Sequence, residues 1–271
     1  MHSDETAGAD ADEHARARSA TSEDIAPRIV LDPTDGASAG ELDASDVQLL
    51  LSTAVHEFRT PLAAISGFAT FLRKHWGELD DDDKLRYLDA INRQALRLTG
   101  LTTDLLELSR VDAGALLLEP ARVNVRGAIS DSIEAVGPAT TIDVQCDPTV
   151  DVLADAEDVR EMLINYIGNA AKYGDPPISV DAAPVDDFVL VRVNDSGPGV
   201  PNEFVPHLFE RFRRARTPDV RSKGGTGLGL AIVRGLAEAQ GGRAWYEPTA
   251  AGASFCFTLP IADGRRIPER A

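Results

Sequence analysis

Residues 46–75 read DVQLLLSTAVHEFRTPLAAISGFATFLRKH, a stretch in which apolar side chains recur at every third or fourth position. This spacing gathers the apolar side chains on one face of an α-helix. The pattern breaks at His75-Trp76-Gly77, and the acidic run Asp80–Asp83 then supplies negative charge where the dipole of a new helix favours it. The sequence therefore predicts one long helix that is followed, after a short loop, by a second.

The second helix is predicted from an apolar seam that begins at Leu85 and ends near Gly114, a residue type common at helix C-termini. Two long helices joined by a short loop form an αα-hairpin. One hairpin buries little apolar surface by itself, so we expect residues 46–114 to pair with a second copy as a dimeric four-helix bundle.

After Leu118 the pattern changes to short β-like runs that alternate with helical stretches. This alternation predicts an α/β sandwich over residues 119–261, which makes the whole chain an α+β protein. The predicted strands are 141–146, 178–182, 188–194, 243–246 and 254–259, and the predicted helices are 125–136, 155–173 and 228–240.

The two ends of the chain have a different composition. Residues 1–45 are acidic and contain no aromatic residue, because the first one in the chain is Phe58. Such a segment cannot bury enough apolar area to offset its ordering entropy, so we expect a disordered tail. It is either a solvated leader or a docking segment. Residues 262–271 are predicted to form a short polar tail.

Charge and composition exclude several classes of function. The formal net charge of −17 disfavours binding to nucleic acid and to anionic lipid headgroups. No apolar stretch is long enough to insert into a membrane, and the N-terminus has no secretory signal. The two cysteines, Cys146 and Cys256, have no spacing typical of a disulfide framework or a zinc site, which favours a cytoplasmic location.

A first candidate site is the helical run HEFRTPL, residues 56–62. A neutral imidazole is nucleophilic, and the adjacent Glu57 carboxylate could hold the Nδ1 proton of His56 and leave Nε2 to attack an electrophile. Thr60 lies one turn further on the same face, and Pro61 removes a helical hydrogen bond. A single histidine in a helix is otherwise more often structural.

A second candidate site is NYIGNAAKY, residues 165–173. Asn165 and Asn169 are four residues apart and share one helix face, and amide oxygens are suitable ligands for Mg²⁺. Lys172 adds a cation for phosphate. Ordinary surface amides on an amphipathic helix would give the same pattern.

Two glycine-rich segments complete the candidates: DSGPG at residues 195–199 and GTGLGL at residues 225–230. Glycine lets a nucleotide approach the backbone, and the N–H groups at a helix start favour phosphate. Neither segment matches a Walker A loop or a Rossmann fingerprint, and each could be a simple tight turn.

In this order, the segments resemble those of the sensor histidine kinases of two-component signalling. HEFRTPL resembles the H box, residues 165–173 the N box, DSGPG the G1 box, FERFRR at 209–214 the F box and GTGLGL the G2 box. The resemblance spans about residues 46 to 261. It implies a dimeric hairpin with His56 as phosphoacceptor, followed by an ATP-binding domain of the gyrase, Hsp90, histidine kinase and MutL (GHKL, or Bergerat) type.

The resemblance also implies roles for single residues in binding ATP and Mg²⁺. Asp195 would accept the adenine amino proton, and Gly197 and Gly199 would allow close approach. Mg²⁺ would be held by Asn165 and Asn169, with the stronger case for Asn169. The other residues implied at the nucleotide are Lys172, Tyr173, Arg214, Gly225, Thr226, Gly227, Leu228 and Gly229, and residues 215–224 would form a mobile lid.

The resulting expectation is a cytoplasmic kinase that phosphorylates His56 and passes the phosphoryl group to an aspartate in the receiver domain of a response regulator. Thr60 resembles the family's phosphatase residue and could orient a water toward the phosphorylated regulator. We expect any sensor to be a separate protein. The alternatives are an ATP-binding scaffold and an anti-sigma-type serine kinase. The presence of His56, Glu57, Asn169 and Asp195 argues against the scaffold, and the H box and the long hairpin argue against the serine kinase.

Overall fold

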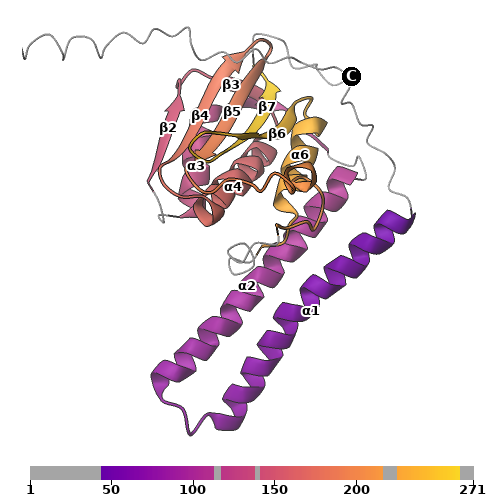
Figure 1. The fold of residues 1–271 in the computed structure, drawn as a ribbon, viewed down its shortest axis with the longest axis vertical. Helices are drawn as coiled ribbons and strands as arrows, with labels where there is room; N and C mark the ends of the chain where they lie inside the picture. Colours follow the sequence, from indigo (N-terminus) through magenta and orange to yellow (C-terminus); the bar gives the residue numbers. More distant parts are fainter. Residues whose placement is uncertain (1–43, 113–116, 138–140, 216–224, 263–271) are drawn as a thin grey trace, which may run out of the picture. The chain divides into compact units, whose positions relative to one another are not determined.

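The computed structural model describes residues 44–112, 117–137, 141–215 and 225–262. Helices α1 (Ala44–His75) and α2 (Asp81–Asp112) form the predicted hairpin, and α1 continues through Pro61 (Figure 1). The predicted cap Gly114 and most of the two predicted tails lie outside the described residues. Within the described ranges, no helix is both long enough and apolar enough to cross a membrane.

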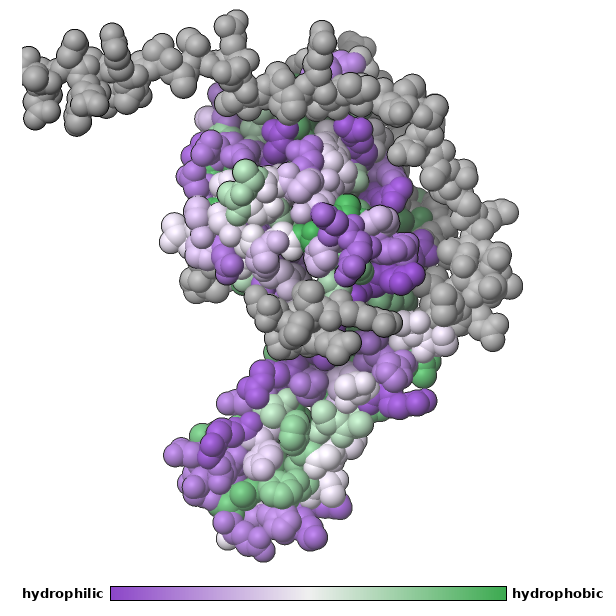
Figure 2. All heavy atoms as spheres, in the orientation of Figure 1, coloured by the Kyte–Doolittle hydropathy of each residue, from purple (hydrophilic) through white to green (hydrophobic). Residues whose placement is uncertain are grey.

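The two helices of the hairpin bury few side chains against each other. Ala54 and Leu72 of α1 and Leu101 of α2 are nearly inaccessible to solvent, and the rings of Phe71 and Tyr87 lie 4.9 Å apart. Hydrophobic side chains also gather on the surface of the hairpin (Figure 2). The exposed ones include Leu62, Leu85, Leu88, Leu96 and Leu106. The hairpin therefore presents apolar surface that it does not bury by itself.

Within its described residues, the sandwich that follows contains one five-stranded sheet and three α-helices (Figure 1). The sheet order is β2-β4-β5-β7-β6, with β2 parallel to β4 and the other pairs antiparallel. The predicted α/β sandwich is confirmed. Its strands are β2 (Ile142–Cys146), β4 (Ile178–Val185), β5 (Phe188–Asp195), β6 (Arg243–Pro248) and β7 (Ala253–Pro260), and its helices are α3 (Val125–Val136), α4 (Ala156–Tyr173) and α6 (Gly229–Ala239).

A second, two-stranded sheet was not predicted from the sequence. Strands β1 (Ala121–Asn124) and β3 (Asp151–Ala154) pair antiparallel and lead into α3 and α4. The side chain of Asn124 caps α3 by accepting a hydrogen bond from the N–H of Gly127 at 2.9 Å. This small sheet sets where α3 begins. A single turn of 3₁₀ helix, η1 (Val205–His207), lies between β5 and α6.

The core lies between the sheet and its helices, because each β-strand turns alternate side chains toward α3, α4 and α6. Val189, Val191 and Val193 of β5 are almost completely buried. The Tyr166 ring of α4 packs against Phe255 and Phe257 of β7, and its hydroxyl donates to the carbonyl of Cys256 at 3.2 Å. The other face of α4 is thereby directed away from the core.

Gln240, at the C-terminal end of α6, fixes the beginning of α4. Its Oε1 accepts from the backbone N–H of Asp155 at 2.7 Å, and its Nε2 donates to Asp158 Oδ2 at 3.0 Å. Burial raises the pKa of Asp158 to about 6, and the neighbouring carboxylates of Asp155 and Glu107 add to this increase, whereas Arg110 opposes it. At neutral pH the protein therefore holds a charged carboxylate where burial disfavours the charge.

Replacing Asp158 with asparagine is expected to stabilise the protein at pH 7.5 and to leave its stability at pH 3.5 almost unchanged. A pKa raised on folding gives a stabilising contribution that is present below the unfolded value of 3.8 and is lost as pH rises through about 6. The difference between the unfolded and folded pKa values of Asp158 corresponds to about 3 kcal/mol of stability at pH 7.5. The amide oxygen introduced by Asp158→Asn can still accept the hydrogen bond from Gln240.

Urea unfolding at several pH values measures this effect. Asp131→Asn, at an exposed position of α3, is the matched control and should not change the pH dependence. Parallel stability curves for Asp158→Asn and the parent chain would contradict the assignment.

Candidate functional site

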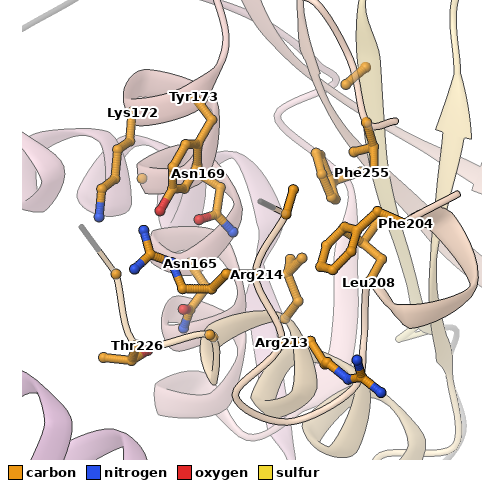
Figure 3. A pocket seen from close by; sticks show the side chains of 18 of the residues that line it. Asn165, Asn169, Lys172, Tyr173, Phe204, Leu208, Arg213, Arg214, Thr226 and Phe255 are labelled. Atoms are coloured by element: carbon orange, nitrogen blue, oxygen red, sulfur yellow. The ribbon is translucent and has the colours of Figure 1, made fainter. Parts of the chain in front are cut away.

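The described part of the sandwich contains a pocket of about 480 Å³ that opens beside α4 (Figure 3). Its walls come from the outward face of α4, the end of β5, the segments before and after residues 216–224, the start of α6, and β7. The predicted site residues that line it are Asn165, Asn169, Lys172, Tyr173, Asp195, Gly199, Arg214, Gly225, Thr226, Gly227 and Gly229. The structure therefore brings the N box, the G1 box and the G2 box together.

Two predicted residues do not line the pocket. Leu228 is completely buried and belongs to the hydrophobic core, so its side chain anchors the start of α6. Gly197 acts through Asp195, because its N–H donates a hydrogen bond to Asp195 Oδ1 at 2.8 Å and holds that side chain in place. The predicted lid, residues 215–224, lies outside the described residues except for Ala215, which lines the pocket.

Asp195 ends β5 and reaches the pocket through tight packing against two glycines. A Cβ at Gly174 would lie 2.5 Å from Asp195 Cβ, and one at Gly197 would lie 2.9 Å from Asp195 Oδ1. Only 7% of Asp195 is exposed, and burial raises its pKa, whereas the hydrogen bond from Gly197 lowers it. The carboxyl group is thus a fixed, largely desolvated acceptor.

One side of the pocket wall is apolar. Phe204, Leu208 and Phe255 lie together on one side of the pocket, and Lys172, Tyr173 and Arg214 lie on the other (Figure 3). An apolar region with one fixed acceptor suits a flat heterocycle that carries an amino group. The opposite side suits an anion.

The anion-binding side is built around Lys172. Burial lowers the pKa of Lys172, and the positive charges of Arg214 and Arg97 lower it further. Its Nζ lies 5.2 Å from the centre of the Tyr173 ring. A polyanion would stabilise the charge of Lys172, which the two arginines disfavour, so this side of the pocket matches a phosphate group.

The glycines of the G2 box keep the backbone close to this side. Gly225 has φ +126°, and a Cβ there would lie 2.7 Å from the Tyr173 hydroxyl. Gly227 has φ +74°, and its carbonyl accepts from the N–H of Phe212 at 2.8 Å. Side chains at either position would be strained.

Asn165 and Asn169 both line the pocket but differ in their surroundings. The amide Nδ2 of Asn165 donates to the backbone carbonyl and to the Oε1 of Glu161, at 3.0 and 2.8 Å. Its Oδ1 faces Gly229, where a Cβ would lie only 2.2 Å away. Asn165 therefore connects α4 to the start of α6, and the oxygen of Asn169 is the better candidate ligand for a hard cation.

Two carboxylates in the pocket wall were missed by the sequence analysis. Glu161 of α4 and Asp104 of α2 both line the pocket, and burial raises the pKa of each. Asp104 also forms a hydrogen bond with the side chain of Thr226 in the G2 box, which lowers its pKa. No local sequence signal marks them, because Asp104 reaches the pocket only through the tertiary fold.

The candidate residues of the H box lie outside the pocket. His56 and Thr60 are exposed on α1, where solvent or a partner can reach them. Glu57 is half-buried and accepts a hydrogen bond at 3.2 Å from Nη2 of Arg97 on α2. The H box therefore contains an accessible imidazole beside a carboxylate that is held by the second helix.

Two family models match the chain. Residues 46–114 match the His Kinase A (phospho-acceptor) domain, and residues 154–263 match the histidine kinase-, DNA gyrase B-, and HSP90-like ATPase domain. One similar protein is the signal transduction histidine-protein kinase AfsQ2 of Streptomyces coelicolor, which is 33% identical over 215 residues, 76% of this chain and 40% of AfsQ2. The chain spans less than half the length of AfsQ2 and of other curated relatives that it matches.

Two solved structures are also similar. Full-length ShkA in complex with AMPPNP is 29% identical, with a TM-score of 0.57 over 81% of this chain and 47% of ShkA. Histidine kinase ThkA in complex with the response regulator protein TrrA is 25% identical, with a TM-score of 0.61 over 82% of this chain and 64% of that chain.

The different surroundings of the two asparagines lead to a prediction. Asn169→Ala is expected to weaken nucleotide binding in the presence of Mg²⁺ by at least about tenfold and to leave binding without Mg²⁺ nearly unchanged. Asn165→Ala should instead lower the free energy of unfolding by about 1–2 kcal/mol, because Glu161 loses its hydrogen-bond donor.

Titration with a fluorescent nucleotide, with and without Mg²⁺, together with urea unfolding, measures both effects. If Asn165→Ala removed the Mg²⁺ dependence and Asn169→Ala did not, the assignment of the ligand would be reversed.

Proposed function

The chain belongs to the sensor histidine kinases of two-component signalling, and from this premise we propose that it uses ATP to phosphorylate His56 and then transfers the phosphoryl group to an aspartate of a response regulator. The observation that carries the proposal is the pocket, with a buried carboxyl group against an apolar wall at one side and clustered cations at the other. The accessible His56–Glu57 pair on α1 supplies the matching acceptor.

The proposed orientation of ATP follows from this polarity. Asp195 would accept the adenine amino proton, and Phe204, Leu208 and Phe255 would cover the base. The triphosphate would lie toward Lys172, Tyr173 and Arg214, beside the glycines of the G2 box.

Asn169 would hold Mg²⁺, with Asn165 nearby. Bound Mg²⁺ would neutralise charge on the phosphates. The residues present fit such a cation, because amide oxygens are hard, neutral ligands that leave most coordination positions to water and phosphate.

The proposed transfer is an in-line displacement by a neutral imidazole. Nε2 of His56 would form a bond to the γ-phosphorus as the bond from phosphorus to the bridging oxygen breaks and the electron pair leaves with ADP. Glu57 would hold the Nδ1 proton of His56 and accept it as the ring becomes cationic.

The proposal assigns the hairpin, residues 46–114, to dimerisation and phosphotransfer, and residues 119–261 to ATP binding. Exposed apolar side chains such as Leu85, Leu96 and Leu106 support pairing of two hairpins as a four-helix bundle. The complex of ThkA with TrrA supports a receiver domain as the partner. Because the donor is ATP, we propose that these domains act in the cytoplasm, with the signal supplied by a sensor, which could be a separate protein.

Replacing His56 with glutamine is expected to abolish incorporation of label from γ-labelled ATP and to leave ATP binding intact, because His56 does not line the pocket. The assay is incubation of the parent chain and the variant with Mg²⁺ and labelled ATP, followed by treatment with acid and with base.

Phosphohistidine is stable in base and labile in acid, so the label on the parent chain should show this behaviour. Acid-stable label, or label retained by His56→Gln, would favour a serine kinase. ATP binding without labelling of the parent chain would favour an ATP-binding scaffold.

Thr60→Ala is expected to spare autophosphorylation and to slow the loss of phosphate from the phosphorylated regulator. Thr60 and His56 are exposed one turn apart on α1, so one docking surface would present both to the receiver domain. The half-life of a labelled regulator, with the parent chain or the variant added, measures the effect. Thr102→Ala, at an exposed position of α2, is the control. Equal damage to both reactions would indicate that Thr60 is structural.

A further inference from the structure

Arg97 of α2 connects the H box to the nucleotide-binding side of the molecule. On one side, its Nη2 donates to Glu57 Oε2 at 3.2 Å across the hairpin. Both side chains are about one-third exposed, at 32% for Arg97 and 30% for Glu57. An ion pair with this much burial is worth more than a surface pair, and it fixes the carboxylate that adjoins His56.

The same face of α2 leads to the pocket. Leu101, one turn after Arg97, is buried, and Asp104, two turns after Arg97, lines the pocket and bonds to Thr226. The positive charge of Arg97 also lowers the pKa values of both Lys172 and Tyr173. Arg97 therefore lies within electrostatic reach of the residues that would face the phosphates.

The guanidinium group of Arg97 has one hydrogen-bond donor, Nε–H, that is not used among the described residues. Its Nε is buried and has no hydrogen-bond partner within the described residues. A buried N–H without an acceptor is costly, and a guanidinium fork matches the geometry of phosphate oxygens. An anionic oxygen arriving between the pocket and His56 would satisfy this group.

We propose that Arg97 is a catalytic residue of autophosphorylation that holds Glu57 beside His56 and binds the phosphoryl group as it passes from ATP to the histidine. Negative charge spreads over three phosphoryl oxygens during transfer, and a positioned guanidinium stabilises that charge. This inference rests on the proposed function and adds to it a residue outside the H, N, G1, F and G2 boxes.

The test compares Arg97→Ala, Arg97→Lys and Arg93→Ala. Arg93 lies one turn before Arg97 on α2 and is exposed, which makes it the matched control. For each chain, the labelling rate at saturating Mg·ATP gives kcat, and separate titrations give the affinity for ADP. The labelling of Arg97→Ala is then repeated with millimolar guanidinium chloride and, at equal ionic strength, with sodium chloride.

The expected result is that Arg97→Ala lowers kcat by about 100-fold, that its affinity for ADP is unchanged, and that guanidinium restores part of the rate where sodium does not. Arg97→Lys should keep part of the rate because it keeps the charge but loses the fork. Arg93→Ala should behave as the parent chain.

Three results would overturn the inference and leave the proposed function intact. In the first, Arg97→Ala labels as fast as the parent chain. In the second, neither guanidinium nor the lysine substitution restores the rate, and in the third the affinity for ADP falls together with kcat. The second and third results would make Arg97 a structural residue of the hairpin. A parent chain that binds ATP but takes up no label would overturn the proposed function itself.

Discussion

The burial of α4 against the sheet is the constraint on which the rest of the site depends. Met162, Leu163, Tyr166 and Ile167 are completely buried, so the rotation of α4 about its axis is fixed. Helical geometry then leaves its remaining face to carry Glu161, Asn165, Asn169 and Lys172 into the pocket. Core packing therefore sets the rotation of α4, and no polar interaction is needed to turn the site residues toward the pocket.

The glycines of the site follow from the same constraint. α4 and β5 approach so closely at Gly174 that a methyl group would collide with Asp195, and α4 and α6 approach so closely at Gly229 that it would collide with Asn165. These contacts fix a carboxyl acceptor and an amide in the wall of one pocket. The glycine-rich segments therefore serve the packing of the elements as much as the approach of a ligand.

The charge of the pocket differs from that of the chain as a whole. The chain has a formal net charge of −17, yet Lys172 lies close enough to Arg214 and Arg97 for their positive charges to lower its pKa. Local arrangement therefore outweighs net charge at short range, where burial reduces screening. The overall negative charge disfavours nucleic acid as a partner, whereas a small polyanion in the pocket can lie beside the positive charges of Lys172 and Arg214.

Much of the fold could be predicted because its signals are local. Helix α3 has the predicted bounds, α4 begins one residue later than predicted, and α6 is one residue shorter at each end. These helices could be predicted because periodicity and capping residues mark them directly. Strands β1 and β3 were missed because each has four residues and they pair over a long sequence separation, as Ala121 does with Ala154.

The same distinction applies to the site. The N, G1 and G2 boxes could be recognised as short motifs, and eleven of the thirteen predicted nucleotide-binding residues line the pocket. Asp104 carries no motif, because it becomes part of the site only when α2 lies beside it. Leu228 lies in the G2 box, but its side chain packs in the hydrophobic core. Its role could therefore not be predicted from the motif.

The contact between α2 and the sandwich combines attraction with repulsion. Leu108 belongs to the core of the sandwich, and Val111 packs against Gly235 of α6 so closely that a Cβ there would lie 2.3 Å away. Beside these apolar contacts, Glu107 faces Asp158 and Asp104 faces Glu161, and each pair raises the pKa of the sandwich carboxyl group.

Apolar burial stabilises this contact, and like charges at its edge reduce that stability at neutral pH. Under the proposed function, His56 on α1 and a nucleotide in the pocket of the sandwich would have to meet for transfer and separate afterwards. A contact whose apolar attraction is partly offset by charge repulsion can be rearranged at a lower free-energy cost than a fully apolar contact. A reaction cycle of this kind requires such a low cost, because the contact must form and break in each turnover.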